Sequence, residues 1–251
     1  QAAMDLGDDL GAAQMEFRYR DDPGPPGGDA TTDLYAGFIR ELPEASQCSD
    51  ALLLFPRKAR AAARQGRDRF GLEFGEGRWY LQDLYDLYFM NKKTLGTPAL
   101  PFAFFQGLDE RFGDEVVTHV VRYRRLPVAA VLSFRFGDTL LPYYSGFRPG
   151  YNHVRANNFM YYRLVAYAIG AGCRWFDFGR SRINAGPYSF KVNQGWEPRR
   201  LHYRFIGVRK PGRASSFNPS NPRTGILRKA WSLVPDAIAE PVGERLSRYL
   251  P

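Results

Sequence analysis

Residues 116–144, VVTHVVRYRRLPVAAVLSFRFGDTLLPYY, decide the fold of this chain. Three runs rich in Val, Leu, Phe and Tyr occupy Val116–Tyr123, Pro127–Phe136 and Thr139–Tyr144, and such residues favour strands. The turns between the runs, RRL and GD, are short enough to join antiparallel neighbours. The stretch therefore predicts three consecutive antiparallel strands.

Helices and further strands are predicted on both sides of these three strands. Helical spacing of apolar residues predicts helices over Trp79–Leu95, Pro101–Phe112 and Arg155–Ile169. The sequence that follows these helices predicts a buried strand (Cys173–Phe178), a loop (Gly179–Gly186), a short helix (Tyr188–Asn193) and a last strand (Arg200–Val208). This order predicts an α/β fold with a mixed, largely antiparallel sheet flanked by helices on both faces.

The two ends of the chain are less regular. The N-terminal part predicts a strand (Ala12–Tyr19), a loop (Asp22–Asp33), a strand or short helix (Leu34–Leu42) and a basic helix (Leu52–Phe70). After Arg209, a stretch rich in Pro, Ser and Asn predicts a linker. Two helices are predicted beyond it, at Ile226–Val234 and Ile238–Tyr249.

The composition bounds the class of protein. The 251 residues are 44% hydrophobic and 15% aromatic, which suffices for a packed core and excludes global disorder. The net charge of +9 favours an anionic partner, although the excess of Arg over Lys is also what GC-rich coding alone would produce. From Glu197 onward the net charge is +7, so most of the excess lies outside the predicted sheet and helices around it.

The two cysteines and the first residues of the chain indicate the cellular compartment that we expect for the protein. Cys48 and Cys173 are far apart and lie in no CxxC or Cys-His pattern, which favours a reducing, cytoplasmic setting without a disulfide framework or zinc site. No apolar run approaches the ~18–20 residues of a membrane-spanning helix. Because the chain opens on Gln1 and its first residues are acidic, we expect no signal peptide there and a missing N-terminal part.

Four motifs in order carry a resemblance to a known family. They are LYDLYFMNKKTLGTPALPFAFFQGL (Leu84–Leu108), FGDTLLPYYSG (Phe136–Gly146), NNFMYYRL (Asn157–Leu164) and FDFGRSRINAGPYSFKVNQGWEPRRLHY (Phe176–Tyr203). With them the chain resembles the FemAB-like transferases of the GNAT acyltransferase superfamily, with a BioF2-like acetyltransferase domain. Within that group it resembles the FemAB proteins associated with PEP-CTERM/exosortase (XrtA) exopolysaccharide systems.

The resemblance implies a division of the chain and an activity. Residues 1–51 would be the remnant of a truncated first GNAT-like half, 52–78 a basic connecting helix and linker, 79–208 a complete GNAT-like transferase domain, and 209–251 a basic C-terminal extension. The implied activity is acyl or aminoacyl transfer to an amino group on a cell-envelope or exopolysaccharide precursor. Such a protein would be cytoplasmic, with tRNA as a partner if the donor is aminoacyl-tRNA, and peripheral contact with an anionic membrane surface would suit its basic extension.

Three residues are candidates for the chemistry itself. Acyl transfer needs a proton acceptor and donors aimed at the developing oxyanion. Lys191 lies in FKVNQGW, which is similar to the Fem pattern FKxxxGF, and we expect it to contact a phosphate or the oxyanion; a surface lysine is the alternative. Asp177 needs a partner such as Arg180 or a backbone cap, and is expected to cap the next turn or accept a proton. Arg180 is expected to hold an anionic substrate group or the oxyanion.

Two further groups are candidates for binding. Substrate positioning is expected of Tyr143, Tyr144, Asn158, Tyr161 and Ser181, although the tyrosines fit a core position equally well. Contact with a phosphate or nucleic acid is expected of Arg57, Lys58, Arg60 and Arg64, with a solvated helix face as the alternative.

The donor and the need for a cofactor stay open in the sequence. The segment RPGYNHVRANN (Arg148–Asn158) does not fit the Gly-rich loop of coenzyme A-using GNAT enzymes, which disfavours acyl-CoA against aminoacyl-tRNA; no metal or bound cofactor is predicted. His119, His153 and His202 lie in no catalytic or metal-binding spacing, and only His153 falls in the predicted cleft loop. Two alternatives remain: a nucleic-acid-binding or scaffolding protein without chemistry, and a coenzyme A-dependent N-acyltransferase with free backbone amides before Arg155.

Overall fold

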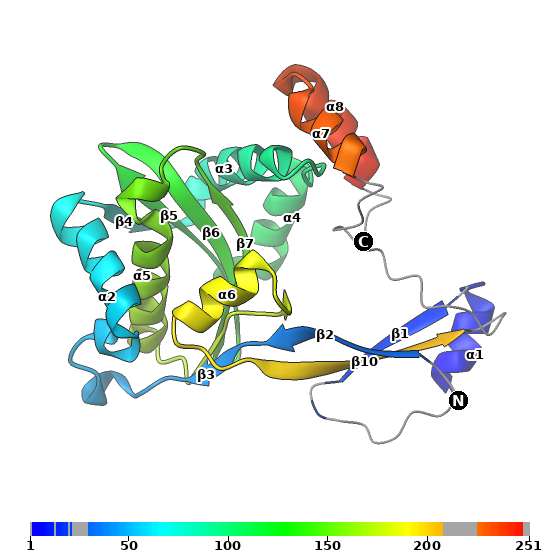
Figure 1. The fold of residues 1–251 in the computed structure, drawn as a ribbon, viewed down its shortest axis with the longest axis horizontal. Helices are drawn as coiled ribbons and strands as arrows, with labels where there is room; N and C mark the ends of the chain where they lie inside the picture. The colour runs from blue at the N-terminus through cyan, green and yellow to red at the C-terminus, as the bar shows by residue number, and fades with distance from the viewer. Residues whose placement is uncertain (1, 13, 20, 22–29, 208–224, 248–251) are drawn as a thin grey trace.

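The computed structural model describes residues 2–12, 14–19, 21, 30–207 and 225–247. Two sheets organise these residues (Figure 1). The larger has six strands in the order β3 (Ile39–Glu41), β8 (Trp175–Asp177), β7 (Thr139–Phe147), β6 (Leu126–Phe136), β5 (Val116–Tyr123) and β4 (Glu73–Glu76). The smaller has the order β1 (Gln14–Tyr19), β10 (Arg199–Gly207), β2 (Ala30–Gly37) and β9 (Ser181–Arg182).

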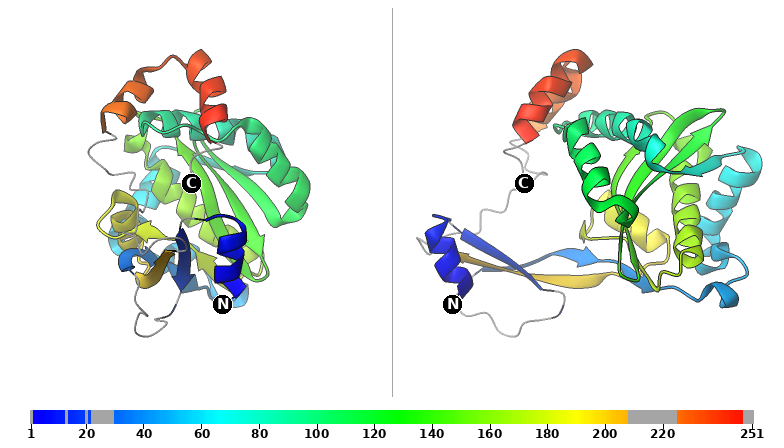
Figure 2. Two further views of the ribbon diagram at one scale, coloured as in Figure 1. Left: turned by 90° about the vertical axis from the view of Figure 1, so that its right-hand side faces the viewer. Right: turned by 180° about the vertical axis from the view of Figure 1, so that it is seen from behind.

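Helices cover both faces of the six-stranded sheet (Figure 1). One face carries α3 (Leu81–Thr94) and α4 (Phe102–Phe112), and the other carries α5 (Ala156–Gly170) with α2 (Arg57–Arg64) outside it. The remaining helices are α1 (Ala2–Asp9), α6 (Gly186–Asn193), α7 (Gly225–Leu233) and α8 (Asp236–Ser247). In Figures 1 and 2 the four-stranded sheet extends from this body as a narrow arm that ends at α1. The predicted mixed α/β fold is confirmed.

The core lies on the two faces of β6. Ala130 and Leu132 pack with α3 and α4, while Ala129 and Val131 pack with α5, and all four are fully buried. Because successive side chains of a strand point to opposite faces, a strand buried on both faces is apolar at every position. This explains the continuous run VAAVL in the stretch that decides the fold.

The three central strands are confirmed with their predicted antiparallel pairing. β5 pairs with β6 from Val116 to Tyr123, and β6 pairs with β7 through Phe136 and Thr139. The first turn places Arg124 and Arg125 at positive φ, and the second uses Gly137 at φ 57°. The helices predicted upstream and downstream are also present, as α3, α4 and α5.

Several elements differ from the prediction. Leu52–Phe70 is not one helix: a 3-10 turn at Ala51–Leu54 precedes α2, and a π-helical turn at Gln65–Arg69 follows it. Leu34–Leu42 is extended and supplies β2 and β3. The last strand, β10, does not join the larger sheet, because β1 and β2 occupy its two edges.

The predicted division of the chain into four parts stays a prediction. The N-terminal 51 residues supply β3 at one edge of the six-stranded sheet, and residues 52–78 contain β4 at its other edge. Of the predicted loop Asp22–Asp33, residues 30–33 begin β2 and residues 22–29 lie outside the described residues, as does the linker over 208–224. Within the part of the chain that the structure describes, every helix is too short or too polar to cross a bilayer.

His119 is a buried polar residue at the sheet edge. Its side chain is 0% exposed, it stacks on Phe74 with ring centroids 5.0 Å apart, and its edge meets Tyr167 at 4.6 Å. Neither ring nitrogen has a hydrogen-bond partner, and Nε2 lies 3.8 Å from a carboxylate oxygen of Glu76. A buried polar group without a partner destabilises the folded state.

Replacing this ring should therefore stabilise the protein, and the stabilisation should be larger at acidic pH than at neutral pH. Burial, with a smaller effect of Arg163, lowers the pKa of His119 to about 3 from 6.5. Below pH 6.5 the unfolded chain binds a proton that the folded chain does not, so the wild type loses stability as the pH falls towards 3. At pH 7, His119→Phe should raise the free energy of unfolding by about 1 kcal/mol. Between pH 7 and pH 5 the wild type should lose about 2 kcal/mol of its free energy of unfolding through His119, and the variant should not lose this amount. Urea unfolding of both proteins at pH 7 and pH 5 measures these free energies. Equal losses of stability in the wild type and the variant between the two pH values would contradict the prediction.

Candidate functional site

The strands β7 and β8 separate soon after they begin to pair. They are parallel, and their only register pairs are Thr139 with Trp175 and Leu140 with Phe176. Beyond Leu140, β7 runs on to Phe147 beside β6, whereas the chain after β8 turns towards the smaller sheet. The two strands diverge beyond these pairs, and we call the region between them the opening; α6 lies beside it in Figure 1.

Aromatic side chains from two helices close the inner part of this opening. The ring of Tyr161, on α5, lies 4.4 Å from that of Phe178 and 5.5 Å from that of Phe190 on α6. Burial raises the pKa of Tyr161 to about 12, although a hydrogen bond with Ser145 on β7 opposes the shift. The phenol of Tyr161 therefore stays protonated at neutral pH and ties α5 to β7.

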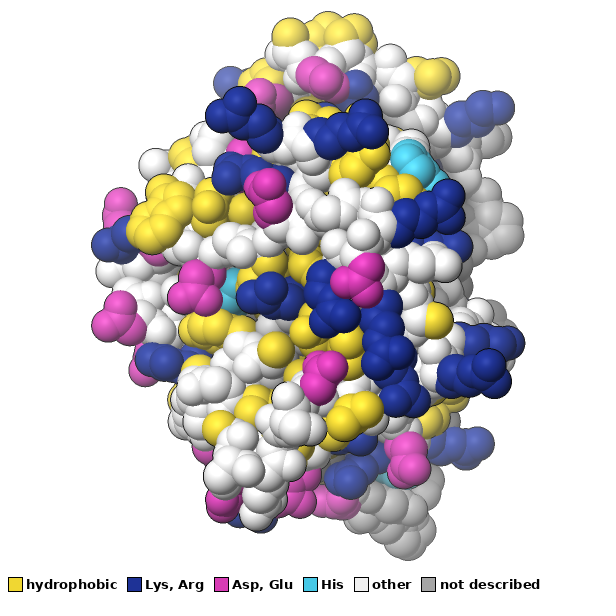
Figure 3. Space-filling view, turned by 90° about the vertical axis from the view of Figure 1, so that its left-hand side faces the viewer, with side chains coloured by type: hydrophobic (Ala, Val, Ile, Leu, Met, Phe, Trp, Pro, Cys, Tyr) yellow, Lys and Arg dark blue, Asp and Glu magenta, His cyan; other side chains and the backbone are white. Residues whose placement is uncertain are grey.

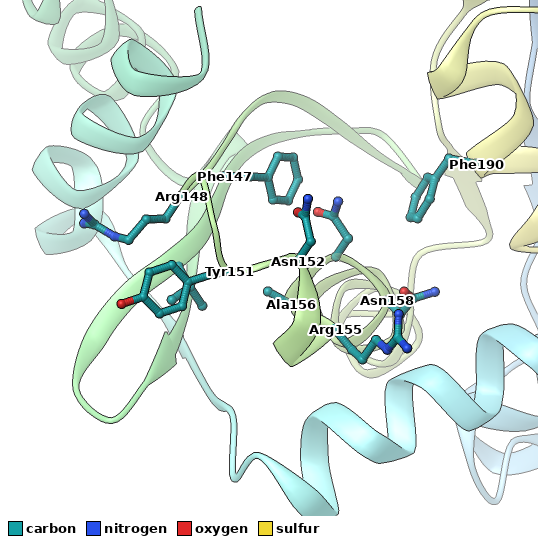
Figure 4. A pocket seen from close by; sticks show the side chains of 10 residues that line it. Phe147, Arg148, Tyr151, Asn152, Arg155, Ala156, Asn158 and Phe190 are labelled. Atoms are coloured by element: carbon teal, nitrogen blue, oxygen red, sulfur yellow. The ribbon is translucent and has the colours of Figure 1, made fainter. Parts of the chain in front are cut away.

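The outer part of the opening is a pocket of about 330 Å³ (Figure 4). It is lined by the end of β7, the loop that follows, the first turn of α5 and one residue of α6: Val128, Phe147, Arg148, Tyr151, Asn152, Arg155, Ala156, Asn157, Asn158 and Phe190. In Figure 4 the ring of Phe190 faces the pocket from across α5. The lining combines aromatic surface with amides and guanidinium groups, a mixture typical of sites for small polar ligands.

The electrostatics of the pocket favour an anion. Arg155 precedes α5 at φ +64°, and its side chain gives the helix no cap. The first backbone N–H groups of a helix have no acceptor within it, and the helix dipole adds positive potential there. The ten described lining residues include two arginines and no carboxylate. Such a helix start can bind a phosphate or carboxylate group.

The two arginines of the pocket have different roles. Arg148 is directed away from the cavity in Figure 4, and its Nε donates to the carbonyl oxygen of Pro127 at 2.8 Å. It therefore fixes the loop to the start of β6. Arg155 is exposed, and its Nε donates to Oε1 of Gln65 at 3.2 Å, which joins the pocket rim to the π-helical turn after α2. Arg155 is thus the cation available to a ligand.

Lys191 follows the pocket residue Phe190 on α6 and lies at the junction of the two sheets. It is only 9% exposed, which rules out the surface-lysine alternative. Its Nζ donates to the carbonyl oxygens of Gly179 and Arg180, both at 3.2 Å, and lies 5.4 Å and 5.8 Å from the ring centroids of Phe38 and Phe178. Burial lowers the pKa of Lys191 to about 8, against the attraction of Asp177. Lys191 thereby holds the chain where it leaves β8 for β9.

The rest of the FKVNQGW motif surrounds Lys191 with packing. Phe190 reaches the pocket, and Trp196, 1% exposed, packs its ring against Phe178 at 5.0 Å. Gly195 has φ +92°, and a Cβ there would lie 2.8 Å from Cδ of Pro56. Only glycine combines this φ with so close an approach. The motif therefore sets the short helix α6 firmly against the sheet junction.

The other two residues predicted to take part in the chemistry face different ways. Asp177 Oδ1 accepts a hydrogen bond from the N–H of Gly179 at 2.7 Å, so the expected turn cap is present. Arg180 points to the smaller sheet: its Nη1 donates to the hydroxyl of Tyr203 at 2.6 Å, and its guanidinium lies over the ring of Tyr35. Ser181 is buried at the start of β9. The structure thus brings Asp177 and Lys191 together and directs the Arg180 side chain away from both.

Of the residues predicted to position substrate, Asn158 lines the pocket and Tyr161 packs beside it. Tyr143 and Tyr144 lie elsewhere. A register shift between β6 and β7 places both rings on the face that carries α3 and α4, where Tyr144 packs on Phe105 at 5.3 Å and Tyr143 is 60% exposed. Neither lines the pocket, so the structure separates the two tyrosines from the other candidates.

The predicted phosphate-contacting residues lie on the outer side of α2. Ala59 and Ala63 turn inward towards α5, whereas Arg57, Lys58 and Arg64 are exposed. Arg60 is half-buried. Figure 3 views this side of the molecule and shows Lys and Arg side chains gathered in a band. Gln65 directly follows α2, and its hydrogen bond with Arg155 joins this side of the molecule to the rim of the pocket.

Comparison with known proteins identifies the family. The sequence matches the family described as the acetyltransferase (GNAT) domain over residues 42–192, more than half of the chain. The chain belongs to the GNAT acetyltransferase domain family. The matched range includes β5 to β8, α5 and Lys191, and thus most of the GNAT domain around the pocket. A sequence search of the curated proteins gave no match.

Solved structures share the fold of this GNAT-domain chain at low identity. The structure of FemX matches with a TM-score of 0.58 and 12% identity, over 80% of this chain and 67% of that one. The C-terminal domain described as a lysylphosphatidylglycerol synthetase from Agrobacterium fabrum matches with a TM-score of 0.53 and 15% identity, over 70% of this chain and 62% of that one. A tandem GNAT protein from the clavulanic acid biosynthesis pathway matches with a TM-score of 0.53 and 11% identity, over 84% and 69%. The chain therefore spans about two thirds of the length of these structures.

Sequence reasoning did not identify most of the pocket of this GNAT domain. Arg148, Tyr151, Asn152 and Arg155 lie in the segment Arg148–Asn158, which lacks the Gly-rich pattern of a phosphate-binding loop, and Phe147 directly precedes it. The signal that could have found them is the cluster of Arg and Asn directly before a helix without a Ser, Thr or Asp cap. His153, in the same loop, is exposed, and its Nδ1 lies 3.1 Å from the carbonyl oxygen of Gly150, outside the pocket lining. In the described residues, no three of His, Cys, Asp or Glu gather closely enough to hold a metal ion.

Proposed function

We propose that this GNAT-domain protein transfers an acyl or aminoacyl group from a phosphate-bearing donor to an amine. The observation that carries the proposal is the pocket at the uncapped start of α5, beside the opening between β7 and β8. Phosphate groups of the donor would bind the first-turn N–H groups of α5 and the guanidinium of Arg155. The carbonyl to be transferred would then lie further in, towards Phe190 and Tyr161.

The chemistry requires an amine to attack the donor carbonyl. A C–N bond forms, the bond from the carbonyl carbon to the donor oxygen or sulfur breaks, and the amine proton leaves while the departing group gains one. Lys191 supports this step in the proposal by fixing the Gly179–Arg180 segment and supplying positive potential near the oxyanion. Asp177 caps the same segment, and its carboxylate is the proposed proton acceptor.

Within this class we favour aminoacyl-tRNA as the donor over acyl-CoA. Both carry phosphate, but the exposed cations of α2 lie outside the pocket, next to the turn whose Gln65 bonds Arg155 at the rim, and such an arrangement suits a long polyanion. The fold shared with FemX and with the domain named for lysylphosphatidylglycerol synthesis agrees with this choice. The proposed acceptor is an amino group on a cell-envelope or exopolysaccharide precursor, and its basis is the resemblance to the FemAB-like, PEP-CTERM-associated proteins.

Arg155 provides the test of the pocket. Arg155→Gln should raise the KM for the phosphate-bearing donor about tenfold and leave kcat within about twofold, because the lost contact binds ground and transition states alike. Arg111→Gln, an exposed arginine on α4, is the matched control and should change neither constant. The measurement is the initial rate of labelled transfer from aminoacyl-tRNA and from acyl-CoA.

The same donor screen separates the competing functions. Turnover of acyl-CoA alone would replace the favoured donor, and an unchanged KM in Arg155→Gln would remove the pocket from the donor site. The exposed cations of α2 also favour a second function, RNA binding without chemistry. Salt-dependent RNA binding without turnover of either donor would establish that function instead.

A further inference from the structure

The two C-terminal helices form a small unit that rests on α3. The hydroxyl of Tyr85 on α3 donates to Glu240 on α8 at 2.9 Å, and Lys93 on α3 pairs with Asp236. Arg228 on α7 donates from Nε and Nη2 to the carbonyl oxygen of Leu95 at 3.1 Å and 2.9 Å. Figures 1 and 2 show α7 and α8 at the edge of the molecule beyond α3.

Helix α8 has two opposite sides of different chemistry. Asp236, Glu240 and Glu244 recur every four residues, and the first two contact α3. Ile238, Val242 and Leu246 recur at the same spacing but two positions later, which places them roughly 200° around the helix. They are 53%, 39% and 42% exposed, although each is a large aliphatic side chain. Solvent therefore meets an apolar stripe on the side of α8 opposite its acids.

Exposed cations accompany the exposed aliphatic side chains on both helices. Leu233, at the end of α7, is 76% exposed, and the exposed Lys229 precedes it by four positions on the same helix face. On α8 the exposed Arg245 adjoins Leu246 and lies three positions after Val242. The helix unit thus presents aliphatic side chains with cations beside them and keeps its acids on the side towards α3.

This combination fits one kind of partner. A stable protein interface buries about 800 Å² per partner and centres on aromatic and arginine anchors, whereas this stripe is a few aliphatic residues wide. Shallow insertion into a lipid surface needs only aliphatic side chains and cations for the anionic headgroups. We propose that α7 and α8 bind the surface of an anionic lipid bilayer through Leu233, Ile238, Val242 and Leu246, with Lys229 and Arg245 at the headgroups.

Vesicle sedimentation with the full chain, without donor, tests this proposal. The wild type should bind phosphatidylcholine vesicles that contain phosphatidylglycerol, should bind pure phosphatidylcholine vesicles weakly, and should lose affinity as salt rises. The triple variant Ile238→Ser, Val242→Ser, Leu246→Ser should lose at least about tenfold in affinity. Lys229→Gln with Arg245→Gln should lose about tenfold on anionic vesicles only.

A variant elsewhere on the surface provides the control. Phe136→Ser removes an apolar ring that is 82% exposed at the end of β6, and it should bind vesicles as the wild type does. Circular dichroism checks that each variant is folded. Equal binding by wild type and triple variant, or no binding by the wild type, would overturn the proposal. A wild-type dimer that becomes monomeric in the triple variant, with no vesicle binding, would instead assign the stripe to a second copy of the chain.

Discussion

Lys191→Met should lower the rate of transfer by about 1000-fold or more while the protein stays folded. The ammonium is buried and holds the carbonyls of Gly179 and Arg180, so its loss frees the segment between β8 and β9 and removes positive potential from the opening. Met fills a similar volume, which should keep the change in free energy of unfolding within about 2 kcal/mol. Initial rates with labelled donor and urea unfolding measure the two effects.

A neighbour on the same helix gives the matched control. Val192 is 40% exposed, and Val192→Met should leave both the rate and the stability close to those of the wild type. A Lys191→Met protein that turns over at the wild-type rate would remove Lys191 from the mechanism. Stability against pH gives an independent check, because burial lowers the pKa of Lys191 from 10.5 to about 8. Between these values the unfolded chain binds a proton that the folded chain lacks, so the wild type should gain stability relative to the Met variant as pH rises from 8.

Gly146→Ala should destabilise the protein by more than about 4 kcal/mol. Gly146 lies on β7 where α3 crosses it, and a Cβ at this position would lie 2.2 Å from backbone atoms of both Leu87 and Tyr88. Backbone atoms of a helix cannot rotate away as a side chain can, so α3 would have to move off the sheet. Urea or thermal unfolding of the variant measures the loss.

The control for Gly146→Ala is a substitution at a glycine that has free space around it. Gly107 lies within α4, and a Cβ there meets nothing within 4 Å. Gly107→Ala should stabilise the protein by about 0.5–1 kcal/mol, since alanine favours the helix. If Gly146→Ala and Gly107→Ala changed the free energy of unfolding by the same amount, the result would contradict the close approach of α3 to β7.

Local patterns in the sequence predicted the elements that bury apolar residues at regular spacing. β5, β6 and β7 could be predicted because their side chains match a sheet covered on both faces, and α5 because its apolar residues recur at helical spacing. β4 could not be predicted: its sequence, EFGE, has one apolar residue, and the strand forms because β5 offers an unpaired edge. The sheet to which β10 belongs is likewise decided by distant partners.

The candidate site was predictable only in part for the same reason. Lys191 and Asp177 lie within the motif Phe176–Tyr203, and the structure places both at the sheet junction. Tyr143 and Tyr144 lie within β7, but the register shift opposite Leu132 and Ser133 sets them on the face away from the pocket. The spacing of residues in the sequence does not show where a strand takes up an extra residue. Such a residue reverses the face to which every later side chain of the strand points.

The pairing of β2 with β10 has a consequence for how the chain folds. Thr32 pairs with Tyr203, so about 170 residues separate two neighbours in one sheet. During synthesis, which proceeds from the N-terminus, β2 would remain without this partner until nearly the whole GNAT domain has been made. Contacts of such long sequence separation form slowly. The junction that holds Lys191 between β9 and β10 should therefore be among the last parts of the molecule to become ordered, after the central hairpins.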